Sequence, residues 1–562
     1  LSFTPLKIEQ PPVPGLSYGL DRVLFNPGVY HLQDERSRVY NFDPYLQKIM
    51  PVNEFDFNAL KRYITSSQDR TLSAMAKKHG RKYVGSTSSM TAVLAHFHYL
   101  LSQWRGINTG VLSKGFPANY TSFTKINRAP VAIFLRWKNG TYAIDADKQY
   151  DSANILSMLG KSMEKLLTLP TDKFERYRRT SQETVSEAER SDPEAYQYST
   201  LGDFMMRSQL DAYDPRLPGT GMFDLKTRAV VSIRHDVHRH EINSGYQIRH
   251  NRGEWNSYER EYYDMMRSTL LKYSLQARMG NMDGIFVAFH NVERIFGFQY
   301  VSIPEMDRAL HQAEGGRHLG DMEFKFSLKL LNEVLEKATQ KFPETSIRLH
   351  FETRETNANF MYIFARPVTE EEADSIQNSN KEKTEEFERK ALGLNKSDTE
   401  DMSPEWEIIR EETEERRDVS LSSTSDSAPP LGEESAETSR AEDKVNGKAD
   451  PGEPVREEGY EGPLLGMTLT IRNKVNGTFI KTPPDLGPDM KWQVEYLLEE
   501  IEEHAKPHLI YQALLKRRSS ALKKHVNGME DEDESEQALS FYQAQLREMS
   551  VEGRKWRQEQ DK

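Results

Sequence analysis

The sequence predicts an α/β protein in which a mixed central sheet is flanked by helices. Residues 153–169 repeat apolar side chains at helical spacing, and residues 204–228 read as two strand-like runs joined by a Pro- and Gly-rich turn. Residues 255–280 are a long helix candidate, and residues 283–291 a buried-strand candidate. The order helix, strand, strand, helix, strand packs helices against the faces of a sheet.

Further elements are expected around this core. Residues 86–105 read as an apolar-faced helix that Ser88 and Ser89 cap. Residues 320–341 form an amphipathic pattern, and residues 346–368 read as a final strand pair. Together these segments extend the predicted core on its C-terminal side.

Two Asn-Gly pairs, at residues 139–140 and 476–477, lie between alternating runs. Asn-Gly favours the type I′ turn of a two-residue hairpin loop. Hairpins are therefore expected over residues 131–147 and 464–483. The second is followed by helix candidates at 490–505 and 508–526 and by a charged last helix, which together predict a mainly helical C-terminal tail.

Charge separates one segment from the rest of the chain. Residues 370–461 hold 29 acidic and 12 basic residues, a net charge of −17, whereas the whole chain of 562 residues has −12 and the remainder therefore +5. Few large apolar residues occur there, so the segment cannot bury enough surface to offset its ordering entropy. The expected division is an N-terminal extended arm (1–80), a core (81–368), an acidic disordered linker (369–462) and the C-terminal tail (463–562).

Composition excludes several classes of site. The chain has no cysteine, which rules out disulfides and thiolate zinc sites. It has no run of about 18 apolar residues, so no transmembrane helix is expected and peripheral membrane association stays open. The chain opens LSFTPLKIEQ without methionine, so any targeting segment is expected to have been trimmed or left out.

The strand candidate that carries Asp224 and Lys226 contains the chemistry of the core. Alternation along a strand places these two side chains on one face and Phe223 and Leu225 on the other. If the turn folds the two runs into an antiparallel hairpin, Asp211 approaches the same face. Two carboxylates beside a lysine suit a divalent metal and a water, the parts needed to break a phosphodiester. The alternative is a surface hairpin whose charged residues merely alternate with core residues.

This spacing resembles the PD-(D/E)xK phosphodiesterase superfamily, which includes phage lambda exonuclease and RecB-type nucleases. Asp211 stands at its first aspartate, Asp224 at its Asp/Glu and Lys226 at its lysine, and Gly160-x-x-x-Glu164 is similar to a helix motif of the lambda-exonuclease type. The resemblance implies a restriction-endonuclease-like core in which Asp211, Asp224 and Lys226 are catalytic. It further implies that Glu164, Asp211, Asp224 and the carbonyl of Leu225 hold Mg²⁺ or Mn²⁺. Gln276 matches the helix glutamine of RecB-type enzymes, and a helix-surface glutamate paired with lysine is the alternative for Glu164.

Roughly residues 1–365 resemble a narrower family, the fungal mitochondrial PET-type proteins that process RNA 5′ ends. The segments that carry this resemblance are VGSTSSMTAVLAHFHYLLSQWRG, LGKSMEKLLTL, SQLDAYDPRLPGTGMFDLKTRAVVSIRHD and ARMGNMDGIFVAFHN. The family implies a mitochondrial 5′-to-3′ exoribonuclease, in the matrix or at the inner membrane, that trims RNA 5′ ends and degrades RNA. It also implies single-stranded RNA and the mitochondrial RNA polymerase as partners.

The segment SIRHDVHRHEI (232–242) supports two interpretations. His238 and His240 share a strand face and would suit zinc, but no second ligand group with metal spacing follows. The other interpretation is a phosphate-contacting, RNA-binding loop at the mouth of the metal site. Its arginines are Arg234, Arg239, Arg249 and Arg252. Trp255, Tyr246 and Trp104 either stack on unpaired bases or belong to the core.

Two functions from other classes stay open at this point. One is a non-catalytic RNA-binding or polymerase-associated scaffold, and the other is a DNA exonuclease, because no residue pattern reveals a reader of the 2′-hydroxyl.

Overall fold

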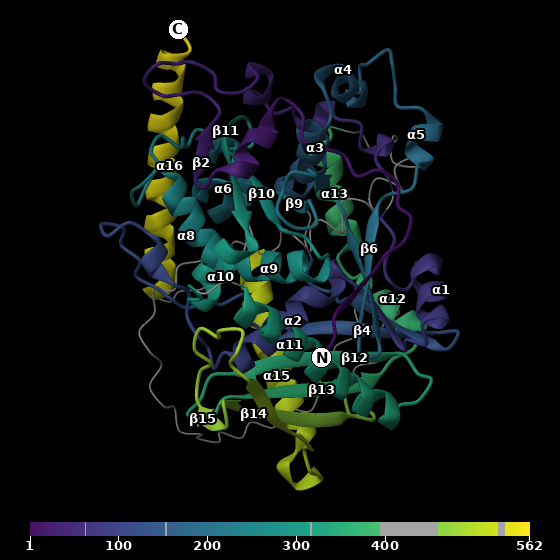
Figure 1. Ribbon diagram of the computed structural model, residues 1–562. Helices are drawn as coiled ribbons and strands as arrows, with labels where there is room; N and C mark the ends of the chain where they lie inside the picture. Colours follow the sequence, from purple (N-terminus) through teal and green to yellow (C-terminus); the bar gives the residue numbers. More distant parts are fainter. Residues whose placement is uncertain (62, 152–153, 315–316, 394–458, 527–533) are drawn as a thin grey trace, which may run out of the picture.

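A computed structural model describes residues 1–61, 63–151, 154–314, 317–393, 459–526 and 534–562. Within these residues the chain forms an 11-stranded sheet and a five-stranded sheet, with helices packed between and around them (Figure 1). The predicted α/β class with a mixed sheet flanked by helices is therefore confirmed.

The large sheet is mixed because β3 runs parallel to both of its neighbours, β5 and β7, while the other pairs are antiparallel. Its order is β1 (Thr4–Leu6), β6 (Tyr196–Leu201), β7 (Phe204–Gln209), β3 (Tyr83–Ser86), β5 (Thr141–Ala146), β4 (Val131–Lys138), β12 (Ile347–Arg354), β13 (Phe360–Pro367), β14 (Leu465–Val475) and β15 (Thr478–Ile480), with β16 (Trp492–Glu500) also paired to β14.

The smaller sheet is built around two parallel neighbours, β9 and β10, in which Lys226 lies opposite Val287. Its order is β2 (Val29–His31), β11 (Ile295–Ser302), β10 (Gly284–His290), β9 (Met222–Ala229) and β8 (Ala212–Tyr213). Nearly every residue of β9 and β10 is buried, as expected for strands covered on both faces.

Both predicted hairpin turns are confirmed. Asn139 and Gly140 have φ values of 50° and 87°, and Asn476 and Gly477 have 48° and 84°. Positive φ at both central residues defines the type I′ turn, whose twist matches that of the flanking strands. These turns connect β4 to β5 and β14 to β15.

Helix α2 (Thr87–Leu101) lies in the middle of the molecule and contacts both the large sheet and the helices α9 and α11. Its cap is Ser86, which forms a capping box with Ser89, so the expected cap at Ser88 is displaced by two residues. The expected helix over 255–280 is divided at Thr269 into α8 and α9. The other helices of the core are α1 (Arg70–Lys78), α3 (Ile155–Thr168), α4 (Thr171–Phe174), α5 (Glu187–Ser191), α6 (Val231–His235), α7 (His240–Asn243), α8 (Tyr258–Ser268), α9 (Leu270–Met279), α10 (Ile303–His311) and α11 (His318–Lys341).

The N-terminal residues are joined to both sheets. Strand β1 pairs with β6 of the large sheet, and β2 pairs with β11 of the smaller sheet. Leu20, Phe55 and Phe57 are completely buried. The arm therefore contributes to the core as well as packing on it.

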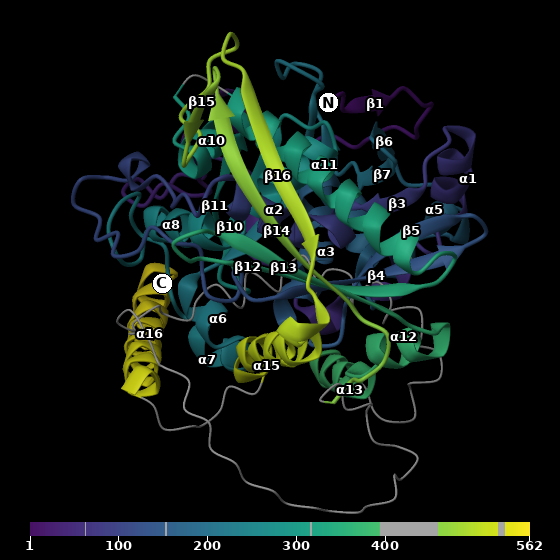
Figure 2. The same cartoon turned by 90° about the horizontal axis from the view of Figure 1, so that it is seen from below.

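The C-terminal residues complete the large sheet, which corrects the expectation of a separate helical tail. Strand β14 is hydrogen-bonded along β13, and the long β14–β16 pair extends the sheet (Figure 2). The helix predicted over 490–505 is wrong, because Trp492–Glu500 form β16 and only Glu503–Ala505 form a short 3-10 helix. An open edge on β14 satisfies the backbone of β16, which outweighs the helical propensity of LLEEIEE. Helices α15 (Pro507–Val526) and α16 (Glu534–Gln560) follow.

Part of the segment predicted as disordered is helical. Helices α12 (Glu370–Gln377) and α13 (Lys381–Ala391) lie within it, and Ala373 and Ile376 are buried against Phe134. Arg136 binds Glu370 and Asp374, both at 2.8 Å, which holds α12 on the sheet. The rest of the predicted linker, residues 394–458, lies outside the described residues, and the boundaries at 80, 368 and 462 stay predictions.

Candidate active site

Strand β9 presents Asp224 and Lys226 together, as its alternation predicts. The Nζ of Lys226 lies 2.9 Å from Oδ2 of Asp224, and each side chain is 9% exposed. The ammonium also lies 5.1 Å from the centre of the Tyr273 ring on α9. The lysine is therefore held by a carboxylate on one side and an aromatic face on the other.

Asp211 approaches this pair from the neighbouring strand. Strand β8 is antiparallel to β9 with Ala212 opposite Phe223, and Asp211 directly precedes β8. The backbone N–H of Leu225 donates to Oδ2 of Asp211 at 3.0 Å. The hairpin is shorter than expected, because only the two residues of β8 pair with β9, while the preceding strand β7 belongs to the large sheet. Asp211 thus lies where the chain crosses between the sheets.

Glu164 comes from α3, which packs against β9. Asn154 caps this helix through hydrogen bonds to the N–H groups of Leu156 and Ser157. The Glu164 carboxylate is 18% exposed and lies 3.8 Å from Lys161 and 4.0 Å from Lys165. Glu164 is therefore paired with lysines on the helix surface, as one interpretation predicted. It also lines the cavity, where the other interpretation places a metal ligand.

These side chains meet at one cavity of about 50 Å³. The predicted residues that line it are Glu164, Asp211, Asp224, Leu225, Lys226 and Gln276. Its other lining residues are Thr87, Gly160, Lys161, Leu167, Gln209, Thr227, Tyr273 and Met282.

Sequence reasoning missed several polar residues of this cavity, among them Gln209 and Tyr273. Gln209 precedes Asp211 by two positions and Tyr273 precedes Gln276 by three, the spacings at which neighbours share a strand face and a helix face. Both periodicities were available in the sequence, but neither residue type suggested a role without the cavity.

Electrostatics around Asp211 indicate that the site fits a cation. Burial raises the pKa of the Asp211 carboxyl well above its usual value, and the nearby carboxylates of Asp224 and Glu164 raise it further, while Lys226 lowers it. Carboxylates brought this close repel one another unless a positive charge lies between them. Carboxylate oxygens are the ligands that Mg²⁺ and Mn²⁺ prefer. The donor types therefore suit a divalent metal, but among the described residues the oxygens of Glu164, Asp211 and Asp224 do not all lie within 4.8 Å of one another, so the carboxylates would have to move together around an ion.

The structure corrects the proposed role of Arg234. Its guanidinium is completely buried and binds the carboxylates of Glu261 and Asp264 and the carbonyl of Ala229. Two carboxylates already occupy this guanidinium, so Arg234 does not serve as a phosphate-binding group. It instead ties α6 to α8 beneath the loop.

The other three arginines of the predicted loop lie nearer the surface but outside the cavity. Arg239 is 55% exposed and lies 3.3 Å from Asp236, while Arg249 lies over the ring of Trp556 at 5.1 Å. Arg252 is exposed and lines a separate groove between α8 and α10. Their role in RNA binding stays a prediction.

The three aromatic candidates lie in packed surroundings. Tyr246 is completely buried, Trp104 stacks on Tyr99 with ring centres 4.8 Å apart, and Trp255 packs against Tyr542 of α16. These positions match the core alternative that the sequence left open.

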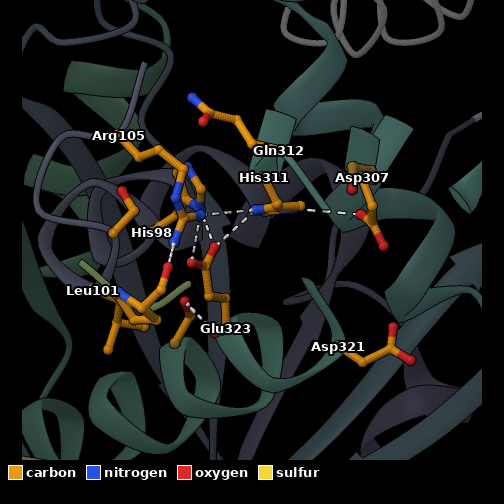
Figure 3. A network of polar contacts seen from close by, with 12 residues as sticks. His98, Leu101, Arg105, Asp307, His311, Gln312, Asp321 and Glu323 are labelled. Atoms are coloured by element: carbon orange, nitrogen blue, oxygen red, sulfur yellow. Dashed lines mark hydrogen bonds and ion pairs between the residues drawn. The ribbon is translucent and has the colours of Figure 1, made fainter. Parts of the chain in front are cut away.

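A second cluster of candidate ligands lies away from this cavity (Figure 3). Within the described part of the chain, His98, His311 and Glu323 are the group whose donor atoms all lie within 4.8 Å of one another, and neither His238 nor His240 belongs to such a group. Because these residues come from α2, α10 and α11, no local spacing in the sequence predicts the group.

The contacts of Glu323 explain this cluster without a metal. One carboxylate oxygen lies 2.7 Å from Nδ1 of His98 and 3.0 Å from Nδ1 of His311, and the other accepts a hydrogen bond from Arg105 at 2.9 Å. Burial by itself would raise the pKa of Glu323, but Arg105 and the two histidines hold this pKa well below its usual value. The guanidinium already neutralises the carboxylate, so the cluster acts as a buried ion pair that joins three helices.

No helix among the described residues combines the length and the apolar character needed to cross a bilayer.

The fold and the cavity define an α/β protein in which carboxylates and a lysine line one cavity. Residues 63–336 match the model of the family described as the mitochondrial protein Pet127. The chain is 38% identical over 358 residues to the mRNA degradation protein pet127 of Schizosaccharomyces pombe, an alignment that spans 63% of this chain and 67% of that protein. This chain belongs to the Pet127 family, which confirms the expected family and its mitochondrial location.

A second relative is the putative mitochondrial translation system component PET127 of Saccharomyces cerevisiae, 37% identical over 416 residues, with 63% of this chain and 50% of that protein covered. The chain thus spans between half and two thirds of the length of these relatives. Among solved structures, Rai1 of Candida albicans in a complex with pU5 and Mn²⁺ covers 68% of this chain and 97% of its own, at 12% identity and a TM-score of 0.29. Rai1 of Scheffersomyces stipitis, bound to (3′-NADP)⁺ and calcium, covers 68% of this chain and 96% of its own, at 12% identity and a TM-score of 0.28.

Proposed function

We propose that this protein is a metal-dependent phosphodiesterase that shortens single-stranded RNA from its 5′ end. The observation that carries the proposal is the meeting of three carboxylates and one lysine, from α3, the β8 region and β9, at a single buried cavity. The name of the S. pombe relative, an mRNA degradation protein, supports RNA as the substrate.

Glu164, Asp211 and Asp224, with the Leu225 carbonyl as a further ligand, would hold Mg²⁺ or Mn²⁺ there. Such an ion supplies a polarised phosphate and a bound water of lowered pKa.

The protein's own groups then position the reaction. Lys226 is fixed by Asp224 at 2.9 Å and by Tyr273, so its ammonium presents N–H donors at a defined point of the cavity. There it stabilises the negative charge that develops on the phosphate as the water oxygen bonds to phosphorus. The bond from phosphorus to the 3′-oxygen breaks, the 3′-oxygen takes a proton, and the shortened strand keeps a 5′-phosphate.

Turnover of a 5′-monophosphorylated single-stranded RNA, with Mg²⁺ and with EDTA, tests this proposal. Asp224→Asn and Lys226→Met should each lower kcat by about 10²-fold or more, as removal of a charge-stabilising group does. Asp172→Asn and Lys173→Met on α4 change the same residue types at exposed positions and serve as matched controls. Wild-type turnover in Asp224→Asn would contradict the site.

The same assay separates the other functions. RNA binding without a metal-dependent product would identify a scaffold, and equal cleavage of a DNA strand of the same sequence would identify a nuclease that does not select RNA. Direction of degradation follows from end-labelled substrates. Association with the mitochondrial RNA polymerase belongs to the proposal as well, and co-purification with that polymerase tests it.

A further inference from the structure

Strand β9 carries a third charged side chain beyond the two in the cavity. Asp224, Lys226 and Arg228 alternate along the strand and so share one face. Arg228 is 1% exposed, and none of its three guanidinium nitrogens has a hydrogen-bond partner within the described residues. A buried guanidinium with no partner is rare in folded proteins, because it loses its hydration without compensation.

The acidic residues near Arg228 are already occupied by other arginines. Arg234 binds both Glu261 and Asp264, and Arg260 lies 3.1 Å from Asp264. Burial, followed by repulsion from Arg234, lowers the pKa of Arg228 to about 9. In this cluster of described residues three guanidinium groups thus share two carboxylates, so the positive charges outnumber the negative ones by one.

This unbalanced charge lies next to the candidate active site. Arg228 is two residues beyond Lys226, about 6.6 Å along the strand. Tyr273 is near both: its ring lies beneath the Lys226 ammonium and lines the cavity, and its phenol interacts electrostatically with Arg228. Tyr273 therefore connects the cavity to the guanidinium of Arg228, which is not itself a lining residue.

We propose that Arg228 binds a second phosphate of the RNA, the one adjacent to the phosphate held at Asp211, Asp224 and Lys226. A guanidinium offers paired N–H donors that match phosphate oxygens, and its charge becomes neutralised when the phosphate enters. The inference rests on the proposed function in taking RNA as the source of the phosphate. The phosphate is either the 5′-terminal group or an internal one.

Binding without cleavage tests the assignment. The affinity of the full chain for a short single-stranded RNA, bearing either a 5′-phosphate or a 5′-hydroxyl, is measured in EDTA by fluorescence anisotropy. Arg228→Met should raise Kd at least tenfold and reduce the slope of log K against log salt by about 0.7, the value for one contact with a single strand. Arg70→Met, at an exposed position of α1, is the control and should leave Kd unchanged. A loss confined to the 5′-phosphate RNA assigns the terminal phosphate, and an equal loss for both RNAs assigns an internal one.

Urea unfolding gives a readout that a purely structural arginine would not share. In phosphate-free buffer, Arg228→Met should unfold at the same or a higher urea concentration than the wild type, because it removes an unbalanced buried charge. Added inorganic phosphate should stabilise the wild type and not the variant. Arg228→Lys keeps the charge but loses the paired donors, so it should fold and bind RNA more weakly than the wild type.

Destabilised Arg228→Met and Arg228→Lys chains that bind both RNAs with wild-type affinity would overturn the assignment. A wild-type protein that binds RNA but does not cut it would instead contradict the proposed nuclease function. The binding assay would still decide whether Arg228 contacts a phosphate.

Discussion

At the residue scale, burial decides what each charged side chain does. Asp224 and Lys226 form an ion pair at the cavity, whereas Arg234 forms buried ion pairs with Glu261 and Asp264. The sequence presents all of them as charges on short strands or loops. Their different partners follow from which helix packs over each one.

Loss of Arg234 should therefore act on stability first. Arg234→Met leaves Glu261 and Asp264 buried with a reduced set of partners, which costs about 3–5 kcal/mol. Arg239→Met changes a side chain that is 55% exposed and should stay within about 0.5 kcal/mol of the wild type. Urea unfolding of both variants checks this. Weaker RNA binding by Arg234→Met at unchanged stability would restore the phosphate-loop interpretation.

Glu305 predicts a pH dependence of stability. It lies at the start of α10 in the groove lined by Tyr262 and Arg308, and burial raises its pKa to about 7, with Arg308 opposing the shift. The folded pKa exceeds the unfolded value of about 4.3. The contribution of Glu305 to stability is thus complete below about pH 4 and is lost as pH rises through 7.

Glu305→Gln should consequently be more stable than the wild type at pH 8, by about 1–2 kcal/mol once its partial exposure is considered. The difference should shrink toward pH 5. Urea midpoints from pH 4 to 9 measure this, with Glu355→Gln at an exposed loop position as the control. Parallel stability curves for the wild type and Glu305→Gln would contradict the expectation.

At the element scale, the turn between β8 and β9 sets the position of Asp211. Gly221 has φ of 80°, its carbonyl accepts from the N–H of Asp214 at 2.9 Å, and Asp283 accepts from its N–H at 2.7 Å. A Cβ at Gly221 would lie 2.5 Å from the Tyr213 ring and 2.7 Å from the Asp214 carbonyl. The turn therefore depends on a glycine for both its conformation and its close packing.

Gly221→Ala should lower stability by about 3 kcal/mol or more, because strain at positive φ adds to the clash. It should also lower turnover, since β8 and Asp211 must shift. Gly28→Ala is the matched control: it has φ of 98° but nothing within 4 Å of its Cβ, so it should cost only about 1 kcal/mol. Equal losses in the two variants, by urea unfolding, would show that packing at this turn is unimportant.

At the scale of the whole molecule, the C-terminal helices pack against the core. Helix α15 buries Tyr511 and Leu514 against Phe364 of β13, and its Arg518 lies 3.2 Å from Asp147 of the core. Helix α16 runs along one side of the molecule against α6 and α7, where Ser550 donates to the Asn243 carbonyl at 3.1 Å (Figure 1). The described residues of the segment 463–562 are thus packed as part of one structure.

A chain that ends at residue 462 should be less stable and prone to associate. Loss of residues 463–562 exposes the edge of β13 and the apolar face around Phe364. An open strand edge of this kind pairs readily with other chains. Size-exclusion chromatography and urea unfolding compare this chain with the full protein. A monomer with an unchanged midpoint would show that residues 463–562 fold as a separate unit.

The sequence by itself determined the features that depend on near neighbours. Alternation paired Asp224 with Lys226, helical spacing placed Glu164 and Gly160 on one face of α3, and Asn-Gly pairs specified two hairpins. Even Gln276 was predicted in the cavity from its motif position. These features need only the local geometry of a strand, a helix or a turn, which a few residues set by themselves.

The tertiary structure decided everything that depends on distant partners. Trp492–Glu500 became a strand because β14 offered an open edge, and Arg234 became buried because α8 supplied two acids. Arg228 has no hydrogen-bond partner among the described residues because those acids were already taken. Such outcomes depend on long-range pairing and on competition for partners. Neither is encoded in the spacing of residues along the chain.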